Sequence, residues 1–373
     1  MTKFIHIADL HIGRNFQALG YKAEKRKIQG LNLLRKICNY ADENLIDIIL
    51  IAGDFIEASE IRESFIDEII SILSKCKSKV FISCGNHDFN SIGSYYQEKN
   101  WSDNVHIFSD ELDSVYLQGL NTRIYGASFG QTYQRQSYLR DFKVKSTNEI
   151  NLMVQHGDIT NSSDANLYNP ISIKEIEGSG LDYLALGHIH KSLGIQKIGK
   201  TTFAYTGAVF SNSFNETGER TFIQGEFTGK ILETREVHIS HPLLINEVIE
   251  LDPSLNSIED LAQVIRGQIE NKYSNFEDNF YRIQLTGKLD TKNFIDKDVL
   301  EAKFEDYNYL EIVDNIELEI DLETARKESS IRGLFIDEMI NKIEHLEIGQ
   351  EKELLERAFK IGLEALGTSK DEN

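Results

Sequence analysis

The sequence contains little cysteine. Cys38, Cys76 and Cys84 are the three cysteines among 373 residues, and they form no paired spacing. Cys84 ends an apolar run typical of a buried strand, where a free thiol behaves as a small apolar side chain. The pattern argues against the disulfide framework of an exported protein and indicates a reducing compartment, the cytoplasm.

Long apolar runs are also lacking. No stretch is long enough to cross a bilayer, and the chain begins with a strand-like segment instead of a charged patch and an apolar signal core. We therefore expect a cytoplasmic protein without membrane contacts. Internal repeats and low-complexity tracts are absent as well, and the length predicts a main domain plus an accessory one.

Positive charge is scarce overall, with 40 Lys and Arg against 60 Asp and Glu and a net charge of -20. Such a balance argues against a nucleic-acid ligand. The deficit is uneven, because residues 241–373 hold 15 basic and 31 acidic side chains while residues 1–40 hold 8 and 2. We expect the acidic third to serve protein contacts, so that contacts to DNA come from the rest.

Two basic segments are candidates for phosphate contacts, and the second is interleaved with Tyr133 and Tyr138, whose rings could stack on bases. The alternative for each segment is an ordinary solvated helix face or polar loop. The candidate DNA-binding residues are Arg14, Lys25, Arg26, Lys27, Arg135 and Arg140.

Strand and helix patterns alternate up to about residue 190 and give way to hairpins up to 239. This order predicts a mixed α/β (α+β) fold in which two packed sheets carry helices on their outer faces, an αββα sandwich, over residues 1–240. His241-Pro242 marks a boundary. Beyond it we expect an α+β accessory domain at 241–322, with strands at 245–251, 280–289 and 310–320 and helices at 258–273 and 297–304.

Residues 323–373 read as amphipathic helices with a break at Gly349 and a frayed tail at 368–373. Such apolar stripes usually pack on their own domain, so periodicity alone favours that role over partner binding.

Five apolar runs end in residue types that bind metals, and in open α/β sheets ligands bind at the carboxyl ends of the strands. In Asp9-x-His11 and His188-x-His190 the paired side chains are two residues apart, so an extended backbone points both to one side. Asp54 offers two oxygens and could bridge two cations. The strand-end residues are Asp9, His11, Asp54, Asn86, His87, Asp88, His156, His188 and His190.

A single Asp or His at a strand end is more often a cap or a turn residue than a ligand. Here five of the ten histidines fall at such ends, which packing does not explain. Carboxylate, imidazole and amide ligands suit manganese, iron or zinc better than calcium. Two metals about 3.5 to 4 Å apart are a common means of hydrolysing phosphate esters.

The motifs Asp9-x-His11, Gly53-Asp54, Gly85-Asn86-His87-Asp88, His156-Gly157-Asp158 and Gly187-His188-x-His190 resemble, in this order, the five motifs of the calcineurin-like metallophosphoesterases. The segment 6–13 and the C-terminal extension resemble the SbcD nuclease group, whose members act on DNA with a coiled-coil ATPase. The stretch 205–218 is similar to the YhaO branch of that group.

This resemblance implies two divalent metal ions, manganese first, with iron, magnesium or zinc as alternatives. Asp9, His11, Asp54 and His190 would hold one ion, and Asp54, Asn86, His156 and His188 the other. His87 would protonate the leaving oxygen or stabilise the phosphate, and Asp88 would orient its imidazole. Glu57 stands where the family often has Asp, which puts substrate positioning in question.

Three functions stay open. The resemblance implies a DNA-repair nuclease, a 3′-to-5′ double-strand exonuclease and single-strand endonuclease, with an SbcC-like ATPase gripped by the C-terminal helices. A phosphatase or phosphodiesterase acting on a phosphoprotein or small molecule fits the acidic balance. A non-catalytic adaptor of the ATPase is the third, although the complete ligand set argues against it. A homodimer stays open too.

Overall fold

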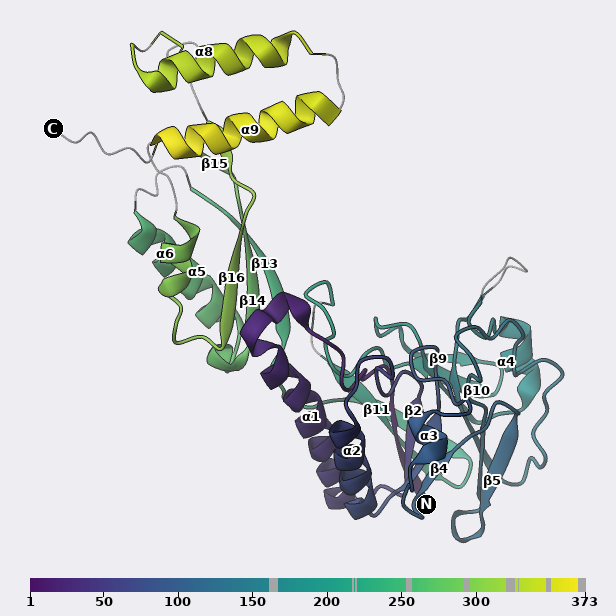
Figure 1. Ribbon diagram of the computed structural model, residues 1–373. Coiled ribbons are helices and arrows are strands. Elements are labelled where there is room, and N and C mark those ends of the chain that lie inside the picture. Colours follow the sequence, from purple (N-terminus) through teal and green to yellow (C-terminus); the bar gives the residue numbers. More distant parts are fainter. Residues whose placement is uncertain are drawn as a thin grey trace. The chain divides into compact units, whose positions relative to one another are not determined.

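Two six-stranded sheets form the N-terminal unit of the computed structural model (Figure 1). The first has the order β12-β11-β1-β2-β3-β4 and the second β5-β6-β7-β8-β10-β9. The predicted two-sheet α/β fold is thereby confirmed. The structure describes residues 1–160, 167–216, 218, 220–252, 257–290, 296–319, 326–327, 329–346 and 350–367, so the expected break at Gly349 and tail at 368–373 lie outside the described residues.

The strands of this unit are short and largely buried. In the first sheet they are β1 (Thr2–Ile7), β2 (Ile48–Ala52), β3 (Lys79–Ser83), β4 (Val105–Ile107), β11 (Thr221–Thr228) and β12 (Ile231–His238). In the second they are β5 (Asp113–Leu117), β6 (Thr122–Gly126), β7 (Ile150–His156), β8 (Tyr183–Gly187), β9 (Gly194–Ile198) and β10 (Thr201–Tyr205).

The main core lies between the sheets, where Phe4, Leu50 and Phe81 pack with Leu152 and Ala185. Successive strand side chains point to opposite faces, so the buried residues between these positions need a second cover. The helices α1 (Ala23–Glu43) and α2 (Glu63–Lys75) lie side by side along the first sheet (Figure 1). The helix α4 (Ile173–Ser179) packs Ile176 into a cluster that includes residues of β7 and β8.

The short helix α3 (Tyr95–Glu98) and the 3-10 helices η1 (Gln17–Lys22) and η2 (Gln118–Leu120) complete the unit. The strands β1, β2 and β3 are parallel to one another, as are β6, β7, β8 and β10. Their carboxyl ends, which carry the predicted metal motifs, therefore gather at one edge of each sheet.

The second unit covers Ile245–Asn373 by contact clustering. It contains β13 (Leu244–Glu250), α5 (Ile258–Lys272), η3 (Phe276–Asp278), β14 (Phe280–Thr286), β15 (Lys288–Asp290), α6 (Lys297–Ala302), β16 (Tyr309–Asp314) and β17 (Glu317–Glu319). Each of the predicted strands at 280–289 and 310–320 is divided in two. The first divides at Gly287, whose φ of 108° lies in the left-handed region that glycine tolerates.

Two helices end the described chain, α8 (Ile331–Glu344) and α9 (Gln350–Gly367). They pack on each other through a small apolar cluster that contains Phe335, Ile336, Ile340, Phe359 and Leu363. None of the helices within the described ranges has the length and hydropathy that a membrane span needs.

Candidate metal centre

The predicted ligands meet in two groups at the carboxyl ends of β1, β2, β3, β7 and β8. The first group contains Asp9, His11 and His190, and the ring nitrogens Nε2 of the two histidines are 3.2 Å apart. Asp54 adds its Oδ2 atom 3.7 Å from His11 Nε2. These four residues come from three loops separated by up to 181 positions in the chain.

The second group contains Asp54, His156 and His188, whose ligand atoms lie close together. His156 Nε2 is 3.4 Å from Asp54 Oδ2, 3.0 Å from Asn86 Oδ1 and 3.2 Å from His188 Nδ1. The same oxygen of Asp54 therefore faces both groups. The structure brings all seven predicted metal ligands together.

Hydrogen bonds fix which imidazole nitrogens carry protons. His156 Nδ1 lies 3.0 Å from the carbonyl oxygen of Ala52, which can only accept, so Nδ1 carries the proton and Nε2 presents a lone pair. Carboxylates of Glu57 and Glu216 fix His11 and His190 in the same way, at 3.2 and 2.7 Å from Nδ1. The Nε2 lone pairs of these rings then face one another and Asp54.

Facing lone pairs and carboxylate oxygens repel unless a cation lies between them. The donor set of carboxylate, imidazole and amide oxygen fits two divalent transition-metal ions, with Asp54 shared. Each of these three imidazoles also has the outward hydrogen bond that orients metal-binding histidines in proteins. The residues present thus fit a two-metal centre.

The electrostatics agree with this assignment. Burial and the charge of Asp54 raise the pKa of Asp9 well above its ordinary value, although backbone N–H donation from His188 opposes the rise. Burial and the neighbouring His156 lower the pKa of His188 to about 4, and burial also lowers that of His156. Without cations the centre therefore holds neutral imidazoles beside carboxylates that destabilise each other.

The backbone at the centre is unusual. Asp9, His11, Asp54 and His188 have φ values of 53°, 45°, 47° and 101°, a left-handed region that L-residues with side chains seldom adopt. Such strain concentrates at functional sites and needs support from the surrounding structure. Here the Asp9 carboxylate accepts the backbone N–H of His188 at 3.0 Å, which ties the first and last motifs together.

Gly53 is required by close packing. A Cβ there would overlap the imidazole of His156, which crosses over from the second sheet. This explains the glycine of the second motif.

His87 lies beside the two groups with 42% of its side chain exposed, which leaves it accessible to a substrate. Its Nδ1 atom is 3.0 Å from Glu57 Oε1. This hydrogen bond, followed by the charges of Asp54 and Glu57, raises the pKa of His87 despite partial burial. A protonated imidazole at this place could supply a proton to a leaving oxygen.

The prediction that Asp88 orients His87 is wrong. The carboxylate of Asp88 is buried and accepts backbone N–H groups of Gly85, Asp54, Phe55 and Ile56. The hydroxyl of Tyr96 also donates to it at 2.7 Å. Asp88 therefore holds the loops after β2 and β3 together, and Glu57 takes the orienting role.

Glu216 is a site residue that sequence reasoning missed. It accepts from His190 Nδ1 and, through its other oxygen, from the backbone N–H of Asn212 at 2.8 Å. Burial opposes ionisation, but these hydrogen bonds hold the pKa of Glu216 below its ordinary value. The only signal was its place in the 205–218 stretch, which gave no role.

The DNA-contact candidates fall into two sets. Lys25, Arg135 and Arg140 are exposed or partly exposed, as are Arg14 and Lys27. Arg26, by contrast, is fully buried, and its guanidinium donates to the carbonyl oxygens of Ser211 and Pro242 and lies 3.8 Å from the centre of the Phe210 ring. Its prediction as a DNA contact is wrong, because one helix position faces the core between two that face outward.

Tyr133 is exposed, whereas Tyr138 donates its hydroxyl to Ser128 O at 2.8 Å and is partly buried. Stacking on a base is therefore open to Tyr133 and hindered for Tyr138.

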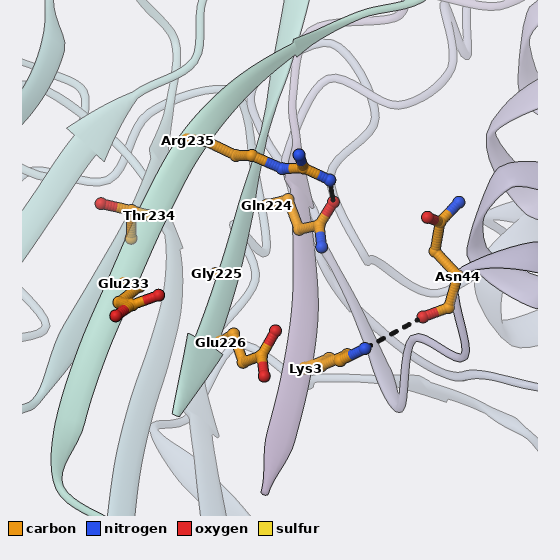
Figure 2. Close-up of a pocket in the computed structure, with 8 residues that line it drawn as sticks. All are labelled: Lys3, Asn44, Gln224, Gly225, Glu226, Glu233, Thr234 and Arg235. Atoms are coloured by element: carbon orange, nitrogen blue, oxygen red, sulfur yellow. Dashed lines mark hydrogen bonds between the residues drawn. The ribbon is translucent and has the colours of Figure 1, made fainter. Parts of the chain in front are cut away.

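A hollow of about 400 Å³ lies on the first sheet, near the end of α1, and is distinct from the metal centre (Figure 2). Its lining is polar, with Lys3, Gln224, Glu226, Glu233 and Arg235 among the side chains. Lys3 and Asp9 are at opposite ends of β1, roughly 20 Å apart at the usual rise of a strand. The hollow therefore does not hold the reacting groups.

Comparison with known proteins agrees with the site. Residues 2–192, just over half of the chain, match the family described as calcineurin-like phosphoesterase. The chain belongs to this family and is a metal-dependent phosphoester hydrolase by class.

A curated relative is the uncharacterized metallophosphoesterase YhaO of Bacillus subtilis (strain 168), which is 28% identical over 230 residues. The match covers 59% of this chain and 56% of the relative. The chain thus spans little more than half the length of that protein.

Similar solved structures include the protein TT1561 of Thermus thermophilus, at 11% identity and a TM-score of 0.41, covering 63% of this chain and 98% of that one. A dimetal phosphatase from Danio rerio matches at 13% identity and a TM-score of 0.40, covering 64% and 99%.

Proposed function

We propose that this metallophosphoesterase is a DNA nuclease of the SbcD type. It would hydrolyse DNA phosphodiesters with manganese, as a 3′-to-5′ exonuclease on duplex ends and an endonuclease on single strands. Its setting would be cytoplasmic DNA repair with an SbcC-like coiled-coil ATPase. The observation that carries hydrolysis is the convergence of seven ligands around Asp54, with the accessible His87 beside them.

The chain's own groups divide the chemistry. Asp9, His11, Asp54 and His190 would hold one ion, and Asp54, Asn86, His156 and His188 the other. When bound, the ions would stabilise the charge that develops on the phosphoryl group and acidify a water. His87 holds a proton on Nδ1 toward Glu57, which leaves Nε2 to meet the leaving oxygen of the substrate.

DNA as substrate is supported by the SbcD-like motifs and by positive side chains around the centre. Arg14 is close enough to His87 to influence its pKa. Lys25, Arg135 and Arg140 reach the surface and could contact phosphates farther along a strand.

The ATPase partner is supported by the C-terminal helices. Ile331 and Leu334 of α8 and Leu354 and Ile361 of α9 are largely exposed although apolar. Residues three or seven positions apart lie on one face of a helix. Each helix therefore keeps an apolar face outside the α8–α9 contact, which a coiled coil could cover.

The alternative function is hydrolysis of a phosphoprotein or small phosphodiester. The net charge of -20 and the burial of Arg26 favour it, because both reduce the surface available to a polyanion. A third function, a non-catalytic adaptor of the ATPase, would leave the centre unused.

One assay separates these functions. Purified protein with Mn²⁺ is tested on blunt duplex DNA, single-stranded DNA, a chromogenic phosphodiester and a phosphopeptide, beside His87→Ala and Asp54→Asn. DNA cleavage that both variants lose supports the nuclease. Turnover of the small or peptide substrates alone supports the alternative, and inactivity on all substrates supports the adaptor.

A further inference from the structure

The loop after β2 lies between the loops after β1 and β3, because β2 is the middle strand of these three. Glu57 is in that loop, three residues after the shared ligand Asp54. Its backbone N–H donates to Ile12 O at 3.0 Å and its carbonyl accepts from Ile61 N at 2.9 Å. The side chain is thus anchored between two neighbouring loops that carry His11 and His87.

The Glu57 carboxylate uses one oxygen for each histidine. His11 Nδ1 donates to Oε2 at 3.2 Å, and His87 Nδ1 donates to Oε1 at 3.0 Å. The hydroxyl of Ser59 also donates to Oε1, at 3.2 Å, and the residue Glu57 is 6% exposed. A second tie links the same loops, since Ala58 N donates to His87 O at 3.2 Å.

We infer that Glu57 is a positioning residue that couples the two functions of the centre. One carboxylate directs the Nε2 lone pair of His11 toward the metals and turns the His87 ring toward the substrate. Asp88 cannot substitute, because its oxygens are committed to backbone N–H groups and Tyr96. The inference rests on phosphoester hydrolysis at this site and holds for either substrate class.

The test variant is Glu57→Gln, which keeps the shape but replaces one acceptor oxygen with a donor. One of the two imidazole N–H groups then has no acceptor. Loss of such an orienting group typically weakens metal binding or activity by about 10- to 100-fold. We expect calorimetry to show Mn²⁺ binding weakened to that extent in Glu57→Gln, and changed by less than about threefold in His87→Ala and in the conservative Glu57→Asp.

A double-variant cycle tests the link to His87. At saturating Mn²⁺, Glu57→Gln should lower kcat on a chromogenic phosphodiester about tenfold or more in the parent protein. In the His87→Ala background the same change should alter kcat by less than about twofold. A merely structural role would lower kcat equally in both backgrounds.

A further readout does not need turnover. Slowly exchanging imidazole N–H protons of His11 and His87 should give downfield NMR signals; Glu57→Gln should weaken both and His87→Ala should remove one. Unchanged Mn²⁺ affinity with unchanged signals in a folded Glu57→Gln protein would overturn the inference. If the parent hydrolyses no phosphoester, the proposed function fails while calorimetry and NMR still decide the role of Glu57.

Discussion

Replacing Glu216 with glutamine should weaken one metal site and spare the other. Glu216 accepts the Nδ1 proton of His190 at 2.7 Å, and His190 belongs to the group with Asp9 and His11. A hydrogen bond to a charged acceptor is worth about 1.5 to 3 kcal/mol, or roughly 10- to 150-fold in an equilibrium constant. We therefore expect the Mn²⁺ affinity of the His190 site to fall by about that factor.

Calorimetric titration with Mn²⁺ is the assay, because two binding steps can be resolved in one experiment. The step assigned to Asn86, His156 and His188 should keep its affinity, since Glu216 touches none of these side chains in the described structure. Glu226→Gln is the matched control, as Glu226 lines the separate hollow of Figure 2. Equal weakening of both steps, or of neither, in a protein that melts like the parent would refute the reasoning.

Other residues of the same structure give three more predictions. Asp54→Asn should weaken both Mn²⁺ steps and abolish hydrolysis, because one oxygen faces both ligand groups; retention of either step in calorimetry would contradict a shared ligand. Burial lowers the pKa of His6 from about 6.5 to about 3, so the unfolded chain binds the proton more readily between these values. The free energy of unfolding should therefore fall as pH drops below 6.5, by about 2 kcal/mol from this residue at pH 5. Urea titrations in a chelator should show this slope in the parent and a shallower one in His6→Gln. Neutralising Lys25 and Lys27 should flatten the salt dependence of DNA binding, reducing the slope by about one for each phosphate that is no longer neutralised, whereas Arg26→Gln should mainly lower the melting temperature.

The strands that carry the ligands could be read from the sequence, since apolar runs ending in Asp, Asn or His define both the sheets and their functional edge. The partners of those ligands could not. Asp88 is next to His87 in the chain, but the turn directs its carboxylate to the backbone of the neighbouring loop. The true partner, Glu57, comes from the adjacent strand's loop.

Glu216 escaped prediction for a related reason. It is 26 positions from His190 in a loop without periodicity, and only the folded chain brings the two side chains together. Arg26 shows the limit of counting charges, because a run of basic residues on a helix does not tell which of them points inward. Its burial also costs solvation that the Ser211 and Pro242 carbonyls and the Phe210 ring offset.

The left-handed backbone at Asp9, His11, Asp54 and His188 bears on how this protein could change over time. Each such residue costs on the order of 1 kcal/mol relative to glycine or asparagine at the same place. Once hydrolysis is no longer selected, replacement of these four side chains would raise thermal tolerance instead of lowering it. Descendants that keep the architecture as a scaffold should therefore accumulate Gly and Asn here first, and Asp9→Gly offers a laboratory preview of that drift.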